Sequence, residues 1–287
     1  MIKIGVTGYG GQLSLCLEAI LPSFPELNIV FFDKAKWDIT DKSRSEALIA
    51  EGEFDYLINT AAFTAVDLAE VKSDLSMTIN GLALEHLSRA CSDHNCHLIH
   101  ISSDYVYHNR LRRPLTEKDP CTPKSQYGKS KLKGDEIILN NAASATILRT
   151  SWIYSRYGNN FLRTMIKLGK SHDRLSVIQD QWGCPTSAHE IAELILSMIK
   201  NRQLSSDQNV IYHYTHTGFT NWYEFAVMIF KMAKINVQVT PIDSASYGAK
   251  APRPHFSILN CSRLEEDTGI KRQHWTEALS SCLSSIS

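Results

Sequence analysis

Residues 2–14 read IKIGVTGYGGQLS, an apolar run that passes through a glycine turn into a helical pattern. Gly8 and Gly11 match the first two positions of a Gly-x-x-Gly-x-x-Gly loop. Its glycines let backbone N–H groups approach a pyrophosphate at the positive end of a helix. Ser14 takes the third position, a departure expected to loosen the packing of the helix against the strand. A tight turn is the simpler explanation of such glycines, but the place of this turn, between the first strand and the first helix, favours dinucleotide binding.

The first half of the chain repeats this alternation of apolar runs, rich in β-branched residues, with helical patterns. Such alternation predicts an α/β fold with a Rossmann-type, doubly wound parallel sheet that carries helices on both faces. The predicted strands are residues 2–8, 28–32, 55–62, 97–102 and 145–152, and the helices between them are residues 12–21, 43–52, 78–94 and 130–141.

Beyond residue 152 the alternation of strand and helix patterns becomes irregular, because prolines interrupt it. Only the helices at 188–201 and 221–234 are clear there. We predict an NAD(P)-binding domain over residues 1–150, completed by residues 187–212. A smaller, interleaved α/β domain over residues 151–186 and 213–287 is expected to bind the substrate. A site between the two would lie at the carboxyl ends of the strands.

The composition narrows the class of protein. Thirty basic residues balance thirty acidic ones, so nothing favours a nucleic-acid or anionic-membrane partner. No apolar run approaches the ~20 residues of a membrane helix, and the chain enters its first strand without a leader pattern. The seven cysteines are irregularly spaced and include no Cys-x-x-Cys pair, which argues against a disulfide framework and against zinc. A cytoplasmic location is expected.

The end of the second strand bears on cofactor choice. Asp33 stands where an acidic residue accepts hydrogen bonds from the ribose 2′-hydroxyl of NAD. Lys34 and Lys36 follow, and a lysine there can instead receive the 2′-phosphate of NADP. A solvated loop explains the same residues, so the choice between NADPH and NADH stays open.

Residues 127–131, YGKSK, place Tyr127 and Lys131 four residues apart on one face of a predicted helix. A buried ammonium beside a phenol is expected to lower the phenol pKa from ~10 toward neutrality. Tyrosine then becomes a usable acid or base. The fourth predicted strand ends in the hydroxyls of Ser102 and Ser103, at the edge expected to face the same cleft.

These motifs, with NTAAFTAVDLAE at 59–70 and SSDYVY at 102–107, resemble the extended short-chain dehydrogenases/reductases. More narrowly, the chain resembles the dTDP-4-dehydrorhamnose reductases. The further similar stretches follow in family order: FFDKAKWDITD (31–41), RTSWIYSRYGNNFLRTMI (149–166), DQWGCPTSA (180–188) and APRPHFSILN (251–260).

The resemblance implies that dTDP-4-dehydro-L-rhamnose is reduced by NADPH or NADH to dTDP-L-rhamnose, a cell-envelope sugar donor. Ser103 would hold the substrate carbonyl, Tyr127 would protonate its oxygen, and Lys131 would tune Tyr127 and bind the nicotinamide ribose. The implied cofactor contacts are Gly8, Gly11, Gln12, Leu13, Asp38, Ile39, Ala61, Ala62, Thr64, Tyr127 and Lys131, and Asp33 joins them by its position. The implied substrate contacts are Ser103, Trp152, Asn159, Asn160 and Arg253.

Some substrate-side residues also have simpler explanations. Core packing would also explain Trp152, helix capping would explain Asn159 and Asn160, and a surface turn would explain Arg253. Some family members bind Mg²⁺ through glutamates at a dimer interface. One of those positions corresponds to Cys16 here, so neither that metal site nor that dimer is expected, and the chain is predicted to be a monomer or a homodimer.

Two other functions remain alternatives. The first is another sugar-nucleotide reductase, epimerase or dehydratase of the same superfamily. Ser103, Tyr127 and Lys131 match the Ser-Tyr-Lys triad of the superfamily. Dehydratases carry an Asp-Glu pair after the hydroxyl residue of this triad, whereas Ser103 is followed here by Asp104 and Tyr105. The second is a non-catalytic subunit resembling the regulatory β subunit of methionine adenosyltransferase, which an eroded triad would indicate. The triad residues are all present.

Overall fold

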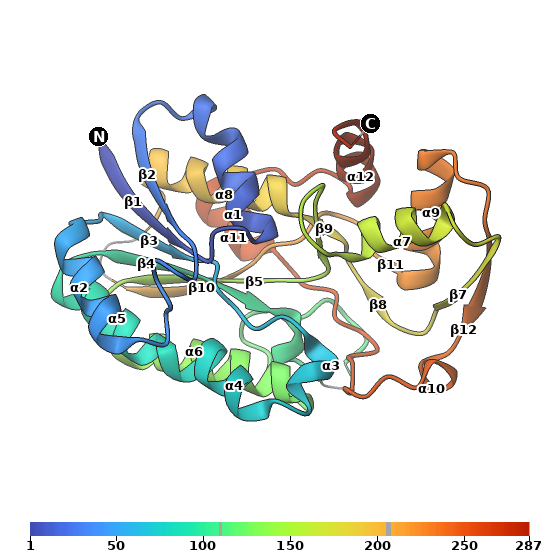
Figure 1. The fold of residues 1–287 in the computed structure, drawn as a ribbon, viewed down its shortest axis with the longest axis horizontal. Coiled ribbons are helices and arrows are strands. Elements are labelled where there is room, and N and C mark those ends of the chain that lie inside the picture. The colour runs from blue at the N-terminus through green and yellow to red at the C-terminus, as the bar shows by residue number, and fades with distance from the viewer. Residues whose placement is uncertain (109–110, 205–207, 287) are drawn as a thin grey trace.

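The computed structural model describes residues 1–108, 111–204 and 208–286, which form a three-layer α/β body with a smaller lobe beside it (Figure 1). A six-stranded, entirely parallel sheet forms the middle layer, in the order β10-β5-β4-β3-β1-β2. The strands are β1 (Ile2–Thr7), β2 (Leu27–Phe32), β3 (Tyr56–Asn59), β4 (His97–Ser103), β5 (Ala145–Thr150) and β10 (Asn209–His213). The predicted doubly wound fold is confirmed.

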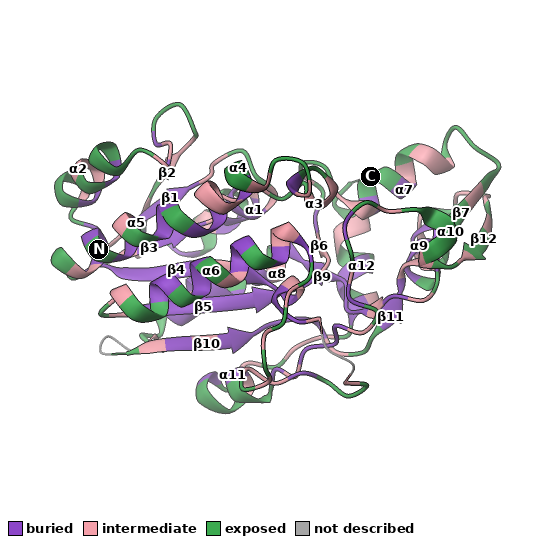
Figure 2. Cartoon of the chain, turned by 90° about the horizontal axis from the view of Figure 1, so that it is seen from below, coloured by how far each residue is buried: buried purple, intermediate pink, exposed green. Residues whose placement is uncertain are grey.

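Helices cover both faces of this sheet, as buried strands on a parallel sheet require (Figures 1 and 2). On one face α1 (Gln12–Ile20) and α8 (Ala188–Lys200) pack together over a core that includes Leu17 and Ile195. On the other face the core includes Leu57 and Ile138. The helices on that face are α2 (Lys42–Gly52), α5 (Ala83–Asp93) and α6 (Gln126–Asn141).

The strand order reverses beside β1, because β2 lies on one side of it and β3 on the other. Such a switch point opens a crevice at the carboxyl ends of the strands, where ligands of these folds bind. Gly8 follows β1 at this point with φ +76°, and a Cβ on it would lie 2.6 Å from the backbone N of Ala61. The turn after β1 and the segment after β3 therefore meet so closely that only glycine fits.

The smaller lobe has its own apolar cluster, which includes Tyr154, Leu162 and Phe225. Its helices are α7 (Phe161–Gly169), α9 (Trp222–Ala233), α10 (Ser244–Tyr247) and α12 (Trp275–Ser284). Its parallel pair is β7 (Arg174–Ile178) with β12 (Gln238–Ile242). Two-residue strands connect it to the body, namely β6 (Ile153–Tyr154) with β9 (Thr186–Ser187) and β8 (Trp182–Gly183) with β11 (Thr220–Asn221). The described residues also form the short helices α3 (Val66–Ala69), α4 (Ser73–Met77) and α11 (Ser262–Thr268) and the helical turns η1 (Leu21–Ser23), η2 (Thr78–Leu82) and η3 (Asp104–Val106).

The predicted helices at 188–201 and 221–234 correspond to α8 and α9. The strand predicted over 55–62 is shorter, because residues after Asn59 turn away against the glycine loop. Strand β10 was not predicted. All seven cysteines are free. Within the described ranges, no helix is both long and apolar enough to cross a membrane.

Candidate active site

Strand β4 and helix α6 bring Ser103, Tyr127 and Lys131 together. Ser103 is the last residue of β4, and α6 starts after Ser125, whose Oγ accepts a hydrogen bond from the Gly128 N–H at 3.1 Å. A Cβ on Gly128 would lie 2.3 Å from the Tyr105 carbonyl oxygen. The glycine therefore lets the first turn of α6 lie directly against the segment after Ser103.

The Ser103 hydroxyl lies close enough to the Tyr127 phenol to act on its pKa as a side-chain partner. Burial raises the Tyr127 pKa to about 12, although the Ser103 contact acts in the opposite direction. The predicted lowering of this pKa by Lys131 is therefore wrong for this structure. The physical reason is that the phenol is buried, so its loss of solvation outweighs the effect of the cation one helical turn away. Tyr127 thus carries its proton at neutral pH, as a general acid must.

Lys131 is 1% exposed. Its Nζ donates to the Ile101 carbonyl at 2.7 Å and lies 2.9 Å from Nε2 of His100. Burial lowers the Lys131 pKa to about 8, while the carboxylate of Asp135 acts to raise it. A buried lysine held in this way is a fixed point charge one helical turn from the phenol.

Behind Lys131 lies a buried ion pair that sequence patterns did not reveal. Asp135 Oδ2 accepts from Arg149 Nε at 2.9 Å, and the two side chains are 1% and 3% exposed. Arg149 Nη1 also donates to the Tyr107 hydroxyl at 2.7 Å, which lies 2.8 Å from His213 Nε2. This network anchors α6 to β5 and thereby fixes the helix that carries Tyr127 and Lys131.

The first turn of α1 fits a dinucleotide phosphate. Its N-cap is Gly11, and no side chain accepts hydrogen bonds from the free N–H groups of this end. Ser14 does not loosen the packing as predicted. Its buried hydroxyl donates to the carbonyls of Gly8 at 3.1 Å and Gly11 at 3.0 Å, which ties the loop to the helix.

The other predicted cofactor residues follow the ends of β2 and β3. Asp33 accepts the Lys36 N–H at 2.9 Å, Asp38 accepts the N–H and hydroxyl of Thr40, and Ile39 is buried in the core. Ala61, Ala62 and Thr64 form the segment after β3, with Ala61 against the glycine turn. The Leu13 side chain is buried in the apolar core under α1, so only the backbone of Leu13 can face a phosphate.

On the substrate side, Trp152 stacks on Trp222 with ring centroids 3.6 Å apart. Its backbone adopts φ +49°, which is rare for a bulky residue and marks a constrained position. A Cβ on Gly183 would lie 2.7 Å from the Trp152 ring. Trp152 is therefore a rigid, half-buried aromatic wall that also packs against the smaller lobe.

Asn159 and Asn160 differ in their surroundings. Asn160 caps α7, where its Oδ1 accepts from the Arg163 N–H, and its Nδ2 donates to Gln12 Oε1 at 2.8 Å. The amide thereby joins the smaller lobe to the glycine turn. Asn159 is exposed, and none of the hydrogen bonds between described residues joins it to the triad.

Arg253 does not lie in a solvated surface turn. Its side chain is 17% exposed, and its guanidinium holds both oxygens of Asp67, with Nη1–Oδ1 at 3.2 Å and Nη2–Oδ2 at 2.6 Å. This contact holds the pKa of the Asp67 carboxyl below its usual range. The charge of Arg253 also acts on Tyr105, whose ring lies edge-on to Tyr127 with centroids 5.4 Å apart.

The model of the RmlD substrate binding domain family matches residues 2–287. The chain belongs to this family. Its most similar relatives include the spore coat polysaccharide biosynthesis protein SpsK of Bacillus subtilis (strain 168), 36% identical over 97% of this chain and 96% of that protein. The dTDP-4-dehydrorhamnose reductase of Sinorhizobium fredii is 35% identical over 96% of this chain and 95% of that protein. The dTDP-4-dehydrorhamnose reductase of Bacillus anthracis, solved in complex with NADP, is 34% identical over 99% of this chain and all of that one, with a TM-score of 0.94.

In this member of the RmlD substrate binding domain family, Asp104 is a site residue whose role the sequence did not suggest. It is 2% exposed and accepts a hydrogen bond from Ser103 Oγ at 3.1 Å. Burial raises the Asp104 pKa to about 6, against the hydrogen bonds from Ser257 and Ser103. The ionised Asp104 carboxylate beside the Ser103 hydroxyl therefore lowers the free energy of unfolding of the protein.

Asp104→Asn is expected to increase the free energy of unfolding at pH 8 by about 2 kcal/mol, because it removes a buried charge. The unfolded carboxyl loses its proton near pH 4 and the folded one near pH 6. The stability of the parent protein should therefore fall as pH rises through this window. Urea unfolding at pH 4 and pH 8 measures this, and the variant should gain only at pH 8. An equal gain at both values would contradict the assignment.

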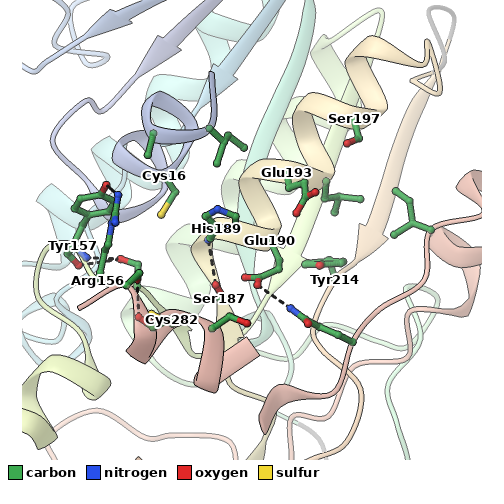
Figure 3. A pocket seen from close by; sticks show the side chains of 18 of the residues that line it. Cys16, Arg156, Tyr157, Ser187, His189, Glu190, Glu193, Ser197, Tyr214 and Cys282 are labelled. Atoms are coloured by element: carbon green, nitrogen blue, oxygen red, sulfur yellow. Dashed lines mark hydrogen bonds between the residues drawn. The ribbon is translucent and has the colours of Figure 1, made fainter. Parts of the chain in front are cut away.

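A cavity of about 620 Å³ lies on the other side of the sheet, between α1, α8 and α12 (Figure 3). None of the predicted catalytic residues is among the described residues that line it. Cys16 points into it, and burial raises the Cys16 pKa to about 12, so its thiol stays neutral. Mg²⁺ prefers oxygen ligands, and no cluster of three or more metal-binding side chains occurs among the described residues. The Cys16 thiol is not an oxygen ligand, and the expectation that the family's Mg²⁺ site is not carried over stays a prediction.

Proposed function

We propose that this chain is an NADPH- or NADH-dependent oxidoreductase that reduces dTDP-4-dehydro-L-rhamnose to dTDP-L-rhamnose. The observation that carries the proposal is the juxtaposition of Ser103, Tyr127 and Lys131 at the carboxyl edge of a doubly wound sheet. The relatives named dTDP-4-dehydrorhamnose reductase match nearly the whole chain and support this substrate.

The residues present fit a nicotinamide dinucleotide. Gly8, Gly11 and the backbone of the first turn of α1 would hold the pyrophosphate, and the segments after β2 and β3 would hold the adenosine and line the cleft. When bound, the reduced nicotinamide supplies the hydride that reduces the sugar carbonyl. The complex of a relative with NADP supports NADPH as an acceptable cofactor.

The chain's own groups then handle the proton. The Ser103 hydroxyl holds the carbonyl oxygen beside the Tyr127 hydroxyl, and Tyr127 donates its proton to that oxygen. The Lys131 ammonium, fixed by the Ile101 carbonyl and His100, stabilises the phenolate that this leaves. Trp152 supplies a rigid wall for the sugar, and we assign residues 151–186 and 213–287 to the sugar-nucleotide side.

The test is to supply dTDP-4-dehydro-L-rhamnose, made in situ by the upstream dehydratase and epimerase, and to follow loss of NADPH or NADH absorbance. Consumption that depends on the epimerase, with dTDP-L-rhamnose as product, is the expected result. Tyr127→Phe serves as the inactive control. Consumption that does not depend on the epimerase would identify another keto-sugar nucleotide as substrate. Bound but unconsumed cofactor would favour a regulatory role.

Arg253→Ala is expected to raise the KM for the sugar nucleotide about tenfold with little change in kcat, because a planar guanidinium gripping a diphosphate acts equally on substrate and transition state. Steady-state kinetics with varied sugar nucleotide measures this. Arg113→Ala is the matched control, since Arg113 is half exposed and pairs with Asp119 away from the triad. An unchanged KM would assign Arg253 to its ion pair with Asp67 alone.

The seven free cysteines agree with the reducing conditions of a cytoplasmic enzyme, which is where we place the reaction.

A further inference from the structure

Three neighbouring strands place a row of polar side chains behind the lysine of the triad. Thr7 on β1, Asn59 on β3 and His100 on β4 are direct register partners, so their side chains project on the same face of the parallel sheet. Thr7 Oγ1 lies 2.7 Å from Asn59 Oδ1, and Asn59 Nδ2 lies 3.1 Å from His100 Nδ1. All three residues are at most 1% exposed.

The row ends on Lys131, whose Nζ lies 2.9 Å from His100 Nε2. Among the other titratable groups, Asp135 on α6 acts on Lys131, and Arg149 on β5 pairs with Asp135. Tyr127 lies on the same helix as Lys131, where Asp104 and Asp135 act on its phenol. Burial and the charge of Lys131 lower the His100 pKa well below its ordinary value, so this imidazole stays neutral.

A neutral imidazole has one N–H and one acceptor nitrogen. If Lys131 is an ammonium, it donates to Nε2, the proton of His100 sits on Nδ1, and the Asn59 carbonyl must accept it. If Lys131 is neutral, His100 donates from Nε2 to the lysine nitrogen, and Nδ1 accepts from the Asn59 amide. The Asn59 amide nitrogen faces Nδ1, and because a flip of the amide exchanges only its oxygen and nitrogen, both patterns keep the same heavy-atom positions. A flip of the amide converts one pattern into the other.

We propose that His100, held by Asn59, is the positioning residue for Lys131, and that the row Thr7–Asn59–His100 couples the tautomer of the imidazole to the protonation state of the lysine. The total number of protons on His100 is the same in both states. The coupling follows from geometry alone, whereas its consequence for turnover rests on the proposed function.

The consequence is a defined dependence on pH. The Lys131 ammonium gains a hydrogen bond from the first pattern, so an acceptor at position 100 keeps the lysine charged to higher pH. Reduction needs that charge beside Tyr127, and turnover falls as pH rises through the lysine pKa, which lies at about 8. We call this fall of kcat at high pH the alkaline limb of the pH profile. Without a hydrogen-bond acceptor at position 100, the alkaline limb moves to lower pH.

The direct test needs no substrate. Nitrogen NMR of the full chain with ¹⁵N-labelled histidines reports the His100 tautomer, and His100→Gln assigns its signals among the 11 histidines. The expected result is a change from Nδ1–H to Nε2–H as pH rises through the Lys131 titration, absent in Lys131→Met. A single tautomer over the whole range, or protonation of the ring, would overturn the coupling.

The kinetic test compares two substitutions. His100→Phe removes the acceptor and should move the alkaline limb of kcat down by about one pH unit. His100→Gln keeps a carbonyl acceptor and should restore most of that shift, with KM for the sugar nucleotide unchanged in both. His97→Gln is the matched control, because His97 lies on the same strand with Ser144 and Thr146 as partners.

An alkaline limb that does not move in His100→Phe would overturn the role in turnover. If no sugar nucleotide is turned over by the parent protein, the proposed function fails, and the NMR measurement still decides the coupling separately.

Discussion

Tyr127→Phe is expected to lower kcat by at least about 100-fold while NADPH stays bound, because it removes only the proton donor. The ring remains in place, so the edge-on packing against Tyr105 and the start of α6 are kept. The raised pKa of Tyr127 means that the parent phenol is fully protonated at neutral pH. Phenylalanine has no hydroxyl to donate to the carbonyl oxygen or to meet Ser103.

Steady-state turnover and nucleotide fluorescence titration measure this prediction together. Tyr105→Phe is the matched control, since Tyr105 packs against Tyr127 and changes by the same single atom. It should retain turnover within about threefold. If Tyr127→Phe turned over at a similar rate, the proton would have to come from another group, and Asp104 would be the first to examine because it also contacts Ser103.

Arg149→Met is expected to lower the free energy of unfolding by about 3–5 kcal/mol, because it leaves the Asp135 carboxylate buried without its cation. It also removes the donor to the Tyr107 hydroxyl, a contact of 2.7 Å. Burial already raises the Asp135 pKa and Arg149 opposes this. Without Arg149 the carboxyl takes up a proton at higher pH, so the deficit should shrink as pH falls toward 5.

Urea unfolding at pH 7.5 and pH 5 measures the change. Lys3→Met is the control, because Lys3 pairs with Glu53 on the surface, where the side chains are 44% and 79% exposed. It should alter stability by no more than about 0.5–1 kcal/mol. A loss for Arg149→Met no larger than that of the control would show that the buried pair contributes little beyond its hydrophobic equivalent.

Much of the fold was predictable because its signals are local. The strand, glycine turn and helix at residues 2–20 are contiguous. A chain in which strands and helices alternate in this way can adopt few topologies other than a parallel sheet covered by helices. The placement of Ser103, Tyr127 and Lys131 was predictable for a similar reason, since Tyr127 and Lys131 share one helix and Ser103 ends a strand. Their catalytic roles stay a prediction. Strand β10 was missed because its apolar run is short, and only its pairing with β5 in the folded chain shows that it belongs to the sheet.

The sign of the Tyr127 pKa shift was not predictable. The spacing in YGKSK reveals a cation four residues away, but it does not reveal that the ammonium is held by His100 and Ile101. Desolvation also depends on everything packed around a hydroxyl, which no local pattern records. The same limit applies to Ser14, whose polar side chain finds two loop carbonyls in the folded chain.

The amino-acid sequence by itself determined the parallel doubly wound sheet, the glycine turn after the first strand and the placement of Tyr127 and Lys131 on one helix, because periodicity and turn chemistry act between near neighbours. Only the tertiary structure decided the pairing of Arg253 with Asp67, which are 186 residues apart, and the register that aligns Thr7, Asn59 and His100. Such contacts depend on which strands become adjacent and where each side chain points, and these are set when the whole core packs.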